Sequence, residues 1–574
     1  MSDRPSVAEV LAEALVASGV RRVFGLCGGH IQEMWDALVR RDVQIVDVRH
    51  EASAVYMAHA SAELTGDLGV ALVTAGPGLT NALTAMSNAS VSRVPVLVLS
   101  GSTPRPQTGM TAMQDVPQVA LAAPVCRRAE SVRHQRHVLD RLTASIRAAC
   151  GEGGEPGATY LDLPTDLQTE RYVGDLDAVA EVTPYRLPEH VPARAQTEAA
   201  AAALRAAKRP LVIAGREAIQ ASDVLQEFLD RTGALYLDTG ESRGAVPSDH
   251  PAAVPAMRAR AMREADVVVV LARRLDFQLG YGSPAVFPGA SRFVRIGRYR
   301  EELSANRIGD LEVRGDVVSA LSALLEAGVE PDDADAAWRA EMLGANADRV
   351  AGLARKIASQ GPGDDGAMHP YSLLAAVNER VDETTVAVAD GGDILSFARV
   401  ALKGQRYLDC GPLGCLGVGV PFATSAALAH PERRVVAVVG DGSFGFTAMD
   451  VDTAVRHGAK AVFVVANNGA WNIERYDQLE RFDGRLVGVD LPGVRYDLLG
   501  RALGAHAERV ETVDELGPAL DRAFENAPAV VDVRVTRDAV SPDYLSGLAE
   551  VPPYQALRAW NEAEEARLAP TEHA

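Results

Sequence analysis

This chain of 574 residues has few aromatic residues, few cysteines and too little positive charge to balance its acidic side chains. Aromatic residues make up only 5% of the chain, whereas 47% of the residues are hydrophobic, so the chain can bury large aliphatic cores. The formal net charge of −20 disfavours nucleic acid and anionic membrane surfaces as general partners. A negative net charge is still compatible with a local basic pocket that binds an acidic substrate.

Long apolar runs and zinc-like cysteine spacings are also missing from the sequence. No apolar run reaches the roughly 18 residues of a membrane span, and the N-terminal residues 6–16 are charged and helix-periodic, unlike a secretory signal. The five cysteines are scattered and odd in number, which favours a reducing compartment. We therefore expect a cytoplasmic protein without a membrane partner.

Short β-branched runs such as 70–74, 94–99 and 435–439 alternate with helical patterns along the whole chain. This alternation predicts an α/β fold in which doubly wound domains are built on mostly parallel sheets. Linkers rich in proline and glycine interrupt the pattern near residues 187–192 and 360–370. We predict three such domains and a tail, over residues 1–182, 190–345, 362–537 and 538–574.

Two of the buried-strand runs end in polar residues that suit a metal and a phosphate. Residues 435–439 lead into Gly-Asp-Gly-Ser at 440–443, and residues 461–466 lead into Asn-Asn-Gly at 467–469. Because neighbouring parallel strands place their carboxyl ends side by side, Asp441 and Asn468 can share one Mg²⁺, with the Ala470 carbonyl, diphosphate oxygens and water as further ligands. The helix that starts after Gly440 offers free N–H groups to a phosphate.

The pair of motifs, Gly-Asp-Gly followed after 24 residues by Asn-Asn, resembles the signature of thiamin-diphosphate-dependent enzymes. The alternatives are an ordinary doubly wound fold with a glycine turn, or a catalytically silent nucleotide-binding or scaffold protein on the same fold. The resemblance implies pyrimidine-binding, middle and diphosphate-binding domains in that order, with thiamin diphosphate and Mg²⁺ as cofactors. It also implies a homodimer or homotetramer with active sites between subunits.

The resemblance extends to individual residues. Glu51 corresponds to the family glutamate that contacts the aminopyrimidine ring and promotes deprotonation of the thiazolium carbon, although a strand-end helix cap is the alternative. Gln114 matches a residue that faces the reacting carbon, in a segment where Asp115 and Met113 depart from the family pattern. The bulky Leu416 would lie beneath the cofactor and the Gly414 carbonyl would receive its amino group. The remaining cofactor contacts implied are Gly28, Gly78, Asn81, Gly392, Asp393, Gly442, Ser443, Asn468, Trp471 and Asn472.

The middle domain carries arginines that can neutralise a nucleotide diphosphate. In some branches of the family this domain holds FAD or ADP, and the candidates here are Arg216, Arg273, Arg274 and Arg298. Solvated surface arginines are the alternative. The acidic residue usual after the corresponding strand is replaced by Gly297-Arg298, so the resemblance leaves ADP open and disfavours FAD.

The substrate class depends on two stretches that disagree. Leu408-Asp409-Cys410-Gly411 resembles oxalyl-CoA decarboxylases and 2-hydroxyacyl-CoA lyases, whereas the position of Glu474 resembles 2-oxo acid decarboxylases. A glutamate there can move protons at the substrate oxygen, or it is an exposed helix residue beside Arg475. For a CoA substrate, the resemblance offers Arg399 and, in a lid-like tail, Ser541 and Tyr544. His30 and Gln32 either line the substrate pocket or are polar residues of a surface loop.

We therefore expect a lyase that cleaves a 2-hydroxyacyl-CoA to formyl-CoA and an aldehyde or ketone, with Glu51, Gln114 and Glu474 as catalytic residues. The alternative is a 2-oxo acid or oxalyl-CoA decarboxylase, or a carboligase like acetolactate synthase.

Overall fold

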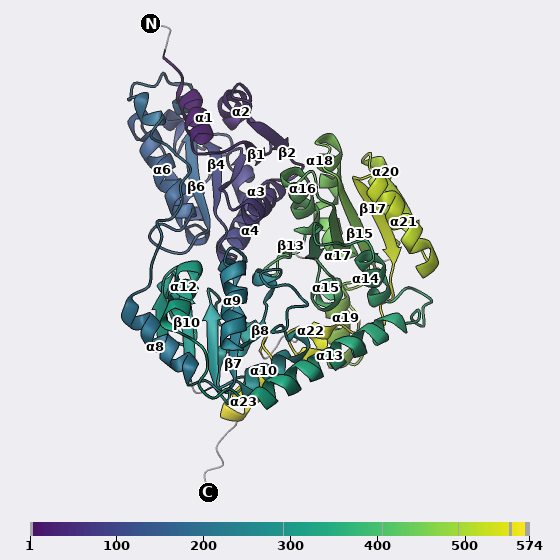
Figure 1. The fold of residues 1–574 in the computed structure, drawn as a ribbon. Coiled ribbons are helices and arrows are strands. Elements are labelled where there is room, and N and C mark those ends of the chain that lie inside the picture. Colours follow the sequence, from purple (N-terminus) through teal and green to yellow (C-terminus); the bar gives the residue numbers. More distant parts are fainter. Residues whose placement is uncertain (1–3, 291, 405, 492, 550–553, 569–574) are drawn as a thin grey trace.

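The computed structural model describes residues 4–290, 292–404, 406–491, 493–549 and 554–568. These residues form three parallel sheets with helices on both faces, arranged as a triangle in which the first and third domains sit above the middle domain in Figure 1. The predicted α/β class is confirmed. Residues 550–553 and 569–574 of the predicted tail lie outside the described residues.

The first sheet has six parallel strands in the order β2-β1-β3-β4-β6-β5. Its central strands β3 and β4 are buried throughout, as expected for strands covered on both faces. The strands are β1 (Arg22–Gly25), β2 (Gln44–Asp47), β3 (Gly69–Val73), β4 (Val96–Ser102), β5 (Arg128–Ser131) and β6 (Ala158–Pro164). The helices are α1 (Val7–Ala17), α2 (Gln32–Val39), α3 (Glu51–Thr65), α4 (Pro77–Val91), α5 (Gln118–Ala122), α6 (Val138–Ala149) and α7 (Thr165–Thr169).

The middle sheet has five parallel strands in the order β11-β10-β9-β7-β8. The strand order reverses between β7 and β9, which is the place where doubly wound folds bind ligands. The strands are β7 (Pro210–Ala214), β8 (Leu235–Leu237), β9 (Val267–Leu271), β10 (Arg292–Gly297) and β11 (Leu311–Arg314). The helices are α8 (Arg194–Arg205), α9 (Ser222–Thr232), α10 (Arg258–Glu264), α11 (Arg300–Ser304) and α12 (Val317–Ala327).

The third sheet repeats the strand order of the first, as β13-β12-β14-β15-β17-β16. The strands are β12 (Val386–Asp390), β13 (Arg406–Leu408), β14 (Val435–Gly440), β15 (Ala461–Asn467), β16 (His506–Val510) and β17 (Ala529–Arg534). The helices are α14 (Pro370–Asn378), α15 (Asp393–Ala401), α16 (Gly419–Ala429), α17 (Asp441–Thr447), α18 (Val451–Arg456), α19 (Asn472–Arg481), α20 (Tyr496–Ala502) and α21 (Val513–Glu525). The first and third domains thus place corresponding loops at corresponding sheet edges.

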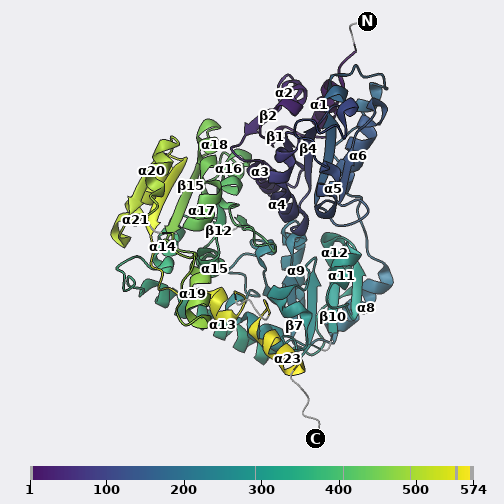
Figure 2. The same cartoon turned by 180° about the vertical axis from the view of Figure 1, so that it is seen from behind.

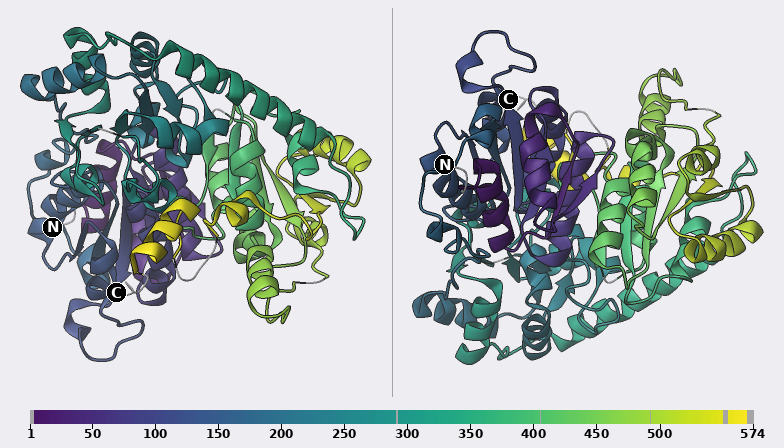
Figure 3. Two further views of the ribbon diagram at one scale, coloured as in Figure 1. Left: turned by 90° about the horizontal axis from the view of Figure 1, so that it is seen from below. Right: turned by 90° about the horizontal axis from the view of Figure 1, so that it is seen from above.

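Helices also join the domains. The long helix α13 (Ala336–Ala358) runs along one side of the molecule from the middle to the third domain (Figure 3). Seen from behind in Figure 2, α22 (Pro542–Ser546) and α23 (Arg558–Leu568) lie across the same two domains. Helix α3 packs on α16, where Ser425 Oγ donates to the Met57 carbonyl at 2.7 Å. Among the described helices, none is long and apolar enough to cross a membrane.

Candidate active site

The carboxyl edge of the third sheet collects the residues of the two signature motifs. Strands β12, β14 and β15 are neighbours, and their register pairs Asp390 with Val439 and Gly440 with Ala466. All three therefore end at the same edge. Helices α15, α17 and α19 begin within a few residues of these strand ends, so their free N–H groups gather there.

Asp441, the carboxylate of the Gly-Asp-Gly turn, is buried, with 3% of its surface exposed. Burial raises its pKa to about 7, while backbone N–H groups, including that of Gly469, stabilise its charged form. Since Gly469 belongs to the loop after β15, the two motifs meet at this carboxylate. The Tyr496 hydroxyl fixes the turn by donating to the Asp441 carbonyl at 2.8 Å.

Asn468 and Asn472 converge on Asp393. The Asp393 Oδ2 atom accepts from Asn472 Nδ2 at 3.1 Å and from Asn468 Nδ2 at 3.5 Å, and Asn468 Oδ1 accepts from the Ala470 N–H at 3.0 Å. Burial raises the pKa of Asp393 to about 7. The predicted metal ligands and diphosphate contacts therefore form one cluster.

Several buried polar atoms of this cluster have no hydrogen-bond partner among the described residues, namely Asp393 Oδ1, Ser443 Oγ and Asn472 Oδ1. A buried group of this kind costs free energy unless a ligand satisfies it. Gly414, in the loop after β13, has φ +69° and no neighbouring atom within 4 Å of where a Cβ would stand. The residues present thus fit a diphosphate and a hard cation.

Glycine is required at position 442 by its contact with Trp471. A Cβ on Gly442 would lie 2.4 Å from the Trp471 ring, which packs edge-on against Phe446 at 6.1 Å. The predicted contact residues Gly442 and Trp471 therefore touch each other. Leu416 is half-buried in the facing loop.

The carboxyl edge of the first sheet holds Glu51. This residue begins α3 and is 6% exposed, and its Oε2 atom accepts from Asn81 Nδ2 at 2.9 Å. His50 fills the cap position, where its ring accepts from the Ala52 N–H. Because His50 caps the helix, the Glu51 carboxylate is free to bind another group.

The remaining first-domain candidates surround the glycine turn after β3. A Cβ on Gly76 would lie 2.7 Å from the Gln114 carbonyl, and Gly28 and Gly78 both face Thr74. Burial lowers the pKa of His30. A hydrogen bond with the Gln114 side chain opposes this shift, so the two side chains are neighbours. Gln32 is exposed, and its nearest polar partner is the Cys27 sulfur at 3.4 Å.

The described residues of one chain do not connect the two edges through a hydrogen bond or ion pair of Glu51. No hydrogen bond among the described residues joins Glu51 to Asp441, Asn468 or Asp393. The start of α3 is held instead by Asp450, whose Oδ1 atom accepts from the Arg49 N–H at 2.8 Å.

The C-terminal segment crosses the third-domain edge. Ser541 is buried and lowers the pKa of Asp393, while Tyr544 donates to Glu480 of α19 at 2.6 Å. Arg399 of α15 lies between Asp409 and Asp543, at 3.2 Å from each. The arginine predicted to contact CoA is therefore paired with two carboxylates of its own chain.

Glu474 lies in the first turn of α19, two residues after Asn472, and is exposed. Within the described part of the chain its carboxylate has no ion-pair partner. Its catalytic role stays a prediction.

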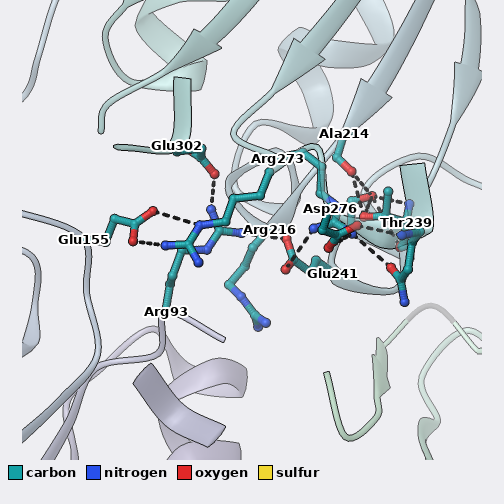
Figure 4. A network of polar contacts seen from close by, with 12 residues as sticks. Arg93, Glu155, Ala214, Arg216, Thr239, Glu241, Arg273, Asp276 and Glu302 are labelled. Atoms are coloured by element: carbon teal, nitrogen blue, oxygen red, sulfur yellow. Dashed lines mark hydrogen bonds and ion pairs between the residues drawn. The ribbon is translucent and has the colours of Figure 1, made fainter. Parts of the chain in front are cut away.

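The carboxyl edge of the middle sheet is closed by ion pairs (Figure 4). The four arginines that could neutralise a nucleotide diphosphate contact carboxylates: Arg216 pairs with Glu63, Arg273 with Asp276, Arg274 with Glu155 and Arg298 with Asp316. Arg93 of the first domain enters the same cluster and binds Glu302 and, at 2.7 Å, Glu241. These arginines therefore pair with carboxylates of their own chain, although the Arg274 side chain keeps 33% of its surface exposed.

Sequence reasoning missed three residues that support the site. Arg537 donates to the Asn468 and Gly469 carbonyls at 3.0 to 3.2 Å, and Gln118 Oε1 accepts from the Gly76 N–H at 2.6 Å. Asp390 accepts from the N–H groups of Gly417 and Gly419 at 3.0 and 2.8 Å. Of these three residues, only Asp390 lies in a local sequence pattern that indicates a site, because it ends a buried strand beside Gly391-Gly392.

Three segments of the chain match domains of known families. Residues 5–121 match the N-terminal TPP binding domain of thiamine pyrophosphate enzymes, residues 197–324 their central domain and residues 390–533 their C-terminal TPP binding domain. These matches cover the three sheets in the expected order.

Proteins from bacteria and animals are similar over most of the chain. A probable acetolactate synthase of Mycobacterium bovis is 33% identical over 94% of this chain and 97% of its own length. The 2-hydroxyacyl-CoA lyase 2 of Homo sapiens is 31% identical over 92% and 90%, and that of Caenorhabditis elegans 29% identical over 90% and 86%. With three matching domains and relatives of this coverage, the chain belongs to the thiamine pyrophosphate enzymes and is an enzyme of the carbon–carbon lyase type.

Proposed function

We propose that the protein is a 2-hydroxyacyl-CoA lyase that uses thiamin diphosphate and Mg²⁺. The bond between the carbonyl carbon and the hydroxylated carbon breaks, the hydroxyl loses its proton to become the carbonyl of an aldehyde or ketone, and the thioester carbon gains a proton to leave as formyl-CoA. Atoms and electrons balance without an oxidant. The similarity to 2-hydroxyacyl-CoA lyases of two animals supports this proposal.

The observation that carries the proposal is the C-terminal segment across the cofactor edge. The Asp543 N–H donates to Ser396 Oγ at 2.7 Å and its carboxylate holds Arg399, both on α15. The resemblance to CoA-using members assigns such a segment to closure over the substrate. If a CoA phosphate bound Arg399 in place of the Asp543 carboxylate, the C-terminal segment would lose this contact with α15 and change its position.

The cofactor residues follow from the geometry of the third-domain edge. Asp441, Asn468 and the Ala470 carbonyl would hold Mg²⁺, and the Ser443 hydroxyl would donate to the diphosphate. Asn472 Oδ1 is an acceptor, so it would need the cation or a donor group of the cofactor. When bound, thiamin diphosphate supplies a nucleophilic carbon for the thioester carbonyl. Glu51 would hold the pyrimidine ring, Gln114 would face the reacting group and Glu474 would take the proton of the substrate hydroxyl.

A homodimer or homotetramer is part of the proposal. Because no hydrogen bond or ion pair of Glu51 connects the two edges among the described residues of one chain, Glu51 would complete its site with the partner's Asp441. ADP is not part of it, since the middle-domain arginines are paired. The five free cysteines suit a reducing cytoplasm.

The test is an assay of the purified protein with thiamin diphosphate, Mg²⁺ and a series of 2-hydroxyacyl-CoA thioesters. We expect formyl-CoA and the matching aldehyde or ketone in equal amounts. The absence of formyl-CoA across chain lengths and both hydroxyl configurations would refute the proposal. Glu474→Gln should lower kcat by about 100-fold or more while Arg475→Gln does not.

A 2-oxo acid decarboxylase or an acetolactate-synthase-like carboligase is the second candidate. It is favoured by the position of Glu474 at the start of α19 and by the similarity to the probable acetolactate synthase. Carbon dioxide release from free 2-oxo acids, with no turnover of acyl-CoA, would select it.

A further inference from the structure

A cavity of about 280 Å³ lies where all three domains meet, away from the signature motifs. The first domain contributes Glu63 and Leu64 at the end of α3, the middle domain contributes Ile219 and Arg243, and the third domain contributes a wall that includes β13. Strand β13 is labelled near the centre of Figure 1, between the three domains. None of these residues belongs to the proposed cofactor or substrate site.

Three arginines line this cavity, namely Arg243, Arg406 and Arg433. Arg243 donates to the Leu402 carbonyl at 2.6 Å, and Arg406 donates to the Leu64 carbonyl at 3.0 Å. Backbone carbonyls fix a guanidinium in place without neutralising its charge. Among the described residues, neither Arg243 nor Arg406 has a carboxylate within the 4.0 Å of an ion pair.

The acidic residues of the cavity do not cancel this charge. Glu63 already pairs with Arg216 and lies 3.1 Å from His59, and Arg433 lies 3.6 Å from Glu432 outside the cavity. Glu383 is then the lining carboxylate that has no ion-pair partner in the described part of the chain. Asp238, outside the cavity lining, also interacts with Arg243, but it shares its charge with Arg258, so the lining keeps an excess of positive charge.

Tyr407 provides an independent sign of a missing ligand. It lines the cavity, its ring lies 4.4 Å from the Arg243 guanidinium, and its buried hydroxyl has no hydrogen-bond partner among the described residues. Burial raises its pKa, so the hydroxyl remains a donor. An acceptor that also carries negative charge would satisfy both Tyr407 and the two arginines.

We propose that this junction cavity binds a compact oxyanion, either a phosphate group or a small dicarboxylate. Its volume of about 280 Å³ lies at the lower end of the roughly 300 to 1,000 Å³ of ligand sites, which suits a compact ligand better than an acyl-CoA. Arginine forks suit both phosphate and carboxylate oxygens. The ligand would bridge α3, whose first residue is Glu51, and β13, which leads to the loop of Gly414 and Leu416. The inference does not depend on the proposed reaction.

The experiment is isothermal titration calorimetry of the full chain loaded with thiamin diphosphate and Mg²⁺, in a chloride buffer. Sodium phosphate and sodium succinate are titrated separately, and the bound cofactor keeps phosphate out of the diphosphate site. We expect one of the two to bind once per chain. Arg243→Gln and Arg406→Gln should each weaken binding at least tenfold, whereas Arg194→Gln, whose side chain is 91% exposed on α8, should not.

A second variant guards against loss of folding. Glu383→Gln removes the opposing charge, so it should tighten binding several-fold, which misfolding cannot do. Phosphate binding alone identifies a phosphate site, and succinate binding alone identifies a dicarboxylate site. The proposal is overturned if neither anion binds the wild type, or if Arg243→Gln, Arg406→Gln and Glu383→Gln all bind as the wild type does.

Discussion

The third and middle sheets end in edges of similar topology that treat their polar groups in opposite ways. At the third-domain edge, Asp393, Ser443 and Asn472 keep buried atoms without partners. At the middle-domain edge, Arg93 of the first domain reaches Glu241 and Arg273 reaches Asp276, and both carboxylates belong to the middle domain. The middle-domain edge also has buried atoms without a hydrogen-bond partner, such as Arg273 Nε and Glu302 Oε2, but they belong to side chains that form ion pairs. An edge whose unsatisfied groups lie outside ion pairs is prepared for a ligand, whereas an edge closed by ion pairs holds domains together.

The largest expected effect separates these two edges directly. Asp441→Asn should weaken binding of thiamin diphosphate with Mg²⁺ by at least about 100-fold, because it removes a charged oxygen ligand. The matched variant is Asp276→Asn. It also replaces an aspartate at the edge of a sheet, but this aspartate pairs with Arg273 at 2.8 Å. Calorimetry should show unchanged cofactor affinity for Asp276→Asn. Equal losses in both variants would contradict the contrast between the edges.

The first-domain edge should behave like the third and not like the middle one. Glu51→Gln is expected to lower kcat by about 100-fold or more while the cofactor still binds, because the amide cannot stabilise a protonated ring. Glu33→Gln, on the exposed face of α2, is the control. Steady-state kinetics at saturating cofactor measure the effect, and a Glu51→Gln enzyme within about twofold of wild type would remove Glu51 from catalysis.

The closed edge predicts a loss of stability instead of a loss of binding. Arg93→Met would leave Glu302 buried without its cation, while Glu241 would keep Arg273 at 3.6 Å, and an uncompensated buried carboxylate typically costs about 3 to 5 kcal/mol. Urea denaturation, with hydrogen exchange of β7 and β9 to assign the loss to the middle domain, measures the effect. Arg194→Met, at an exposed ion pair, should cost less than about 1 kcal/mol.

Two further results qualify this comparison. If Arg93→Met costs no more than Arg194→Met, the ion pairs do not hold the edge. If Arg93→Met with Glu302→Gln recovers part of the loss, the cost comes from the uncompensated carboxylate and not from altered packing.

The contrast also shows what the sequence can and cannot predict. The strands before Asp441 and Asn468 are continuous β-branched runs, so their ends, and the meeting of the two motifs, follow from parallel-sheet geometry. The local sequence pattern does not predict β6 or β17, although both strands lie inside their sheets. The sheet order, which depends on pairing between distant segments, came from the structure.

The middle-domain arginines show where local patterns fail. They were expected to bind a nucleotide or to be solvated, and the structure pairs them with carboxylates instead. Arg93 lies 148 residues before Glu241 and 209 before Glu302, so no spacing rule connects them. Whether a strand-end charge meets a ligand or another domain is decided by how domains pack.

The smallest expected effect tests the closed edge through pH. Burial, followed by repulsion from Glu302, raises the pKa of Glu217 above its ordinary value of 4.5. The folded state therefore binds the proton more tightly than the unfolded state, so this contribution to stability is complete below about pH 4.5 and is lost as pH rises through the folded-state pKa. Denaturation of the protein from pH 5 to pH 8 should show stability falling as pH rises, and Glu217 contributes at most about 1.4 kcal/mol per pH unit because it binds one proton. Since burial also raises the pKa values of Asp441 and Asp393, Glu217→Gln should reduce the slope without abolishing it, whereas Glu227→Gln on the outer face of α9 should leave it unchanged. A slope in Glu217→Gln equal to that of the wild type would place the titrating groups elsewhere and would leave the middle-domain edge as insensitive to pH as a set of fully paired charges.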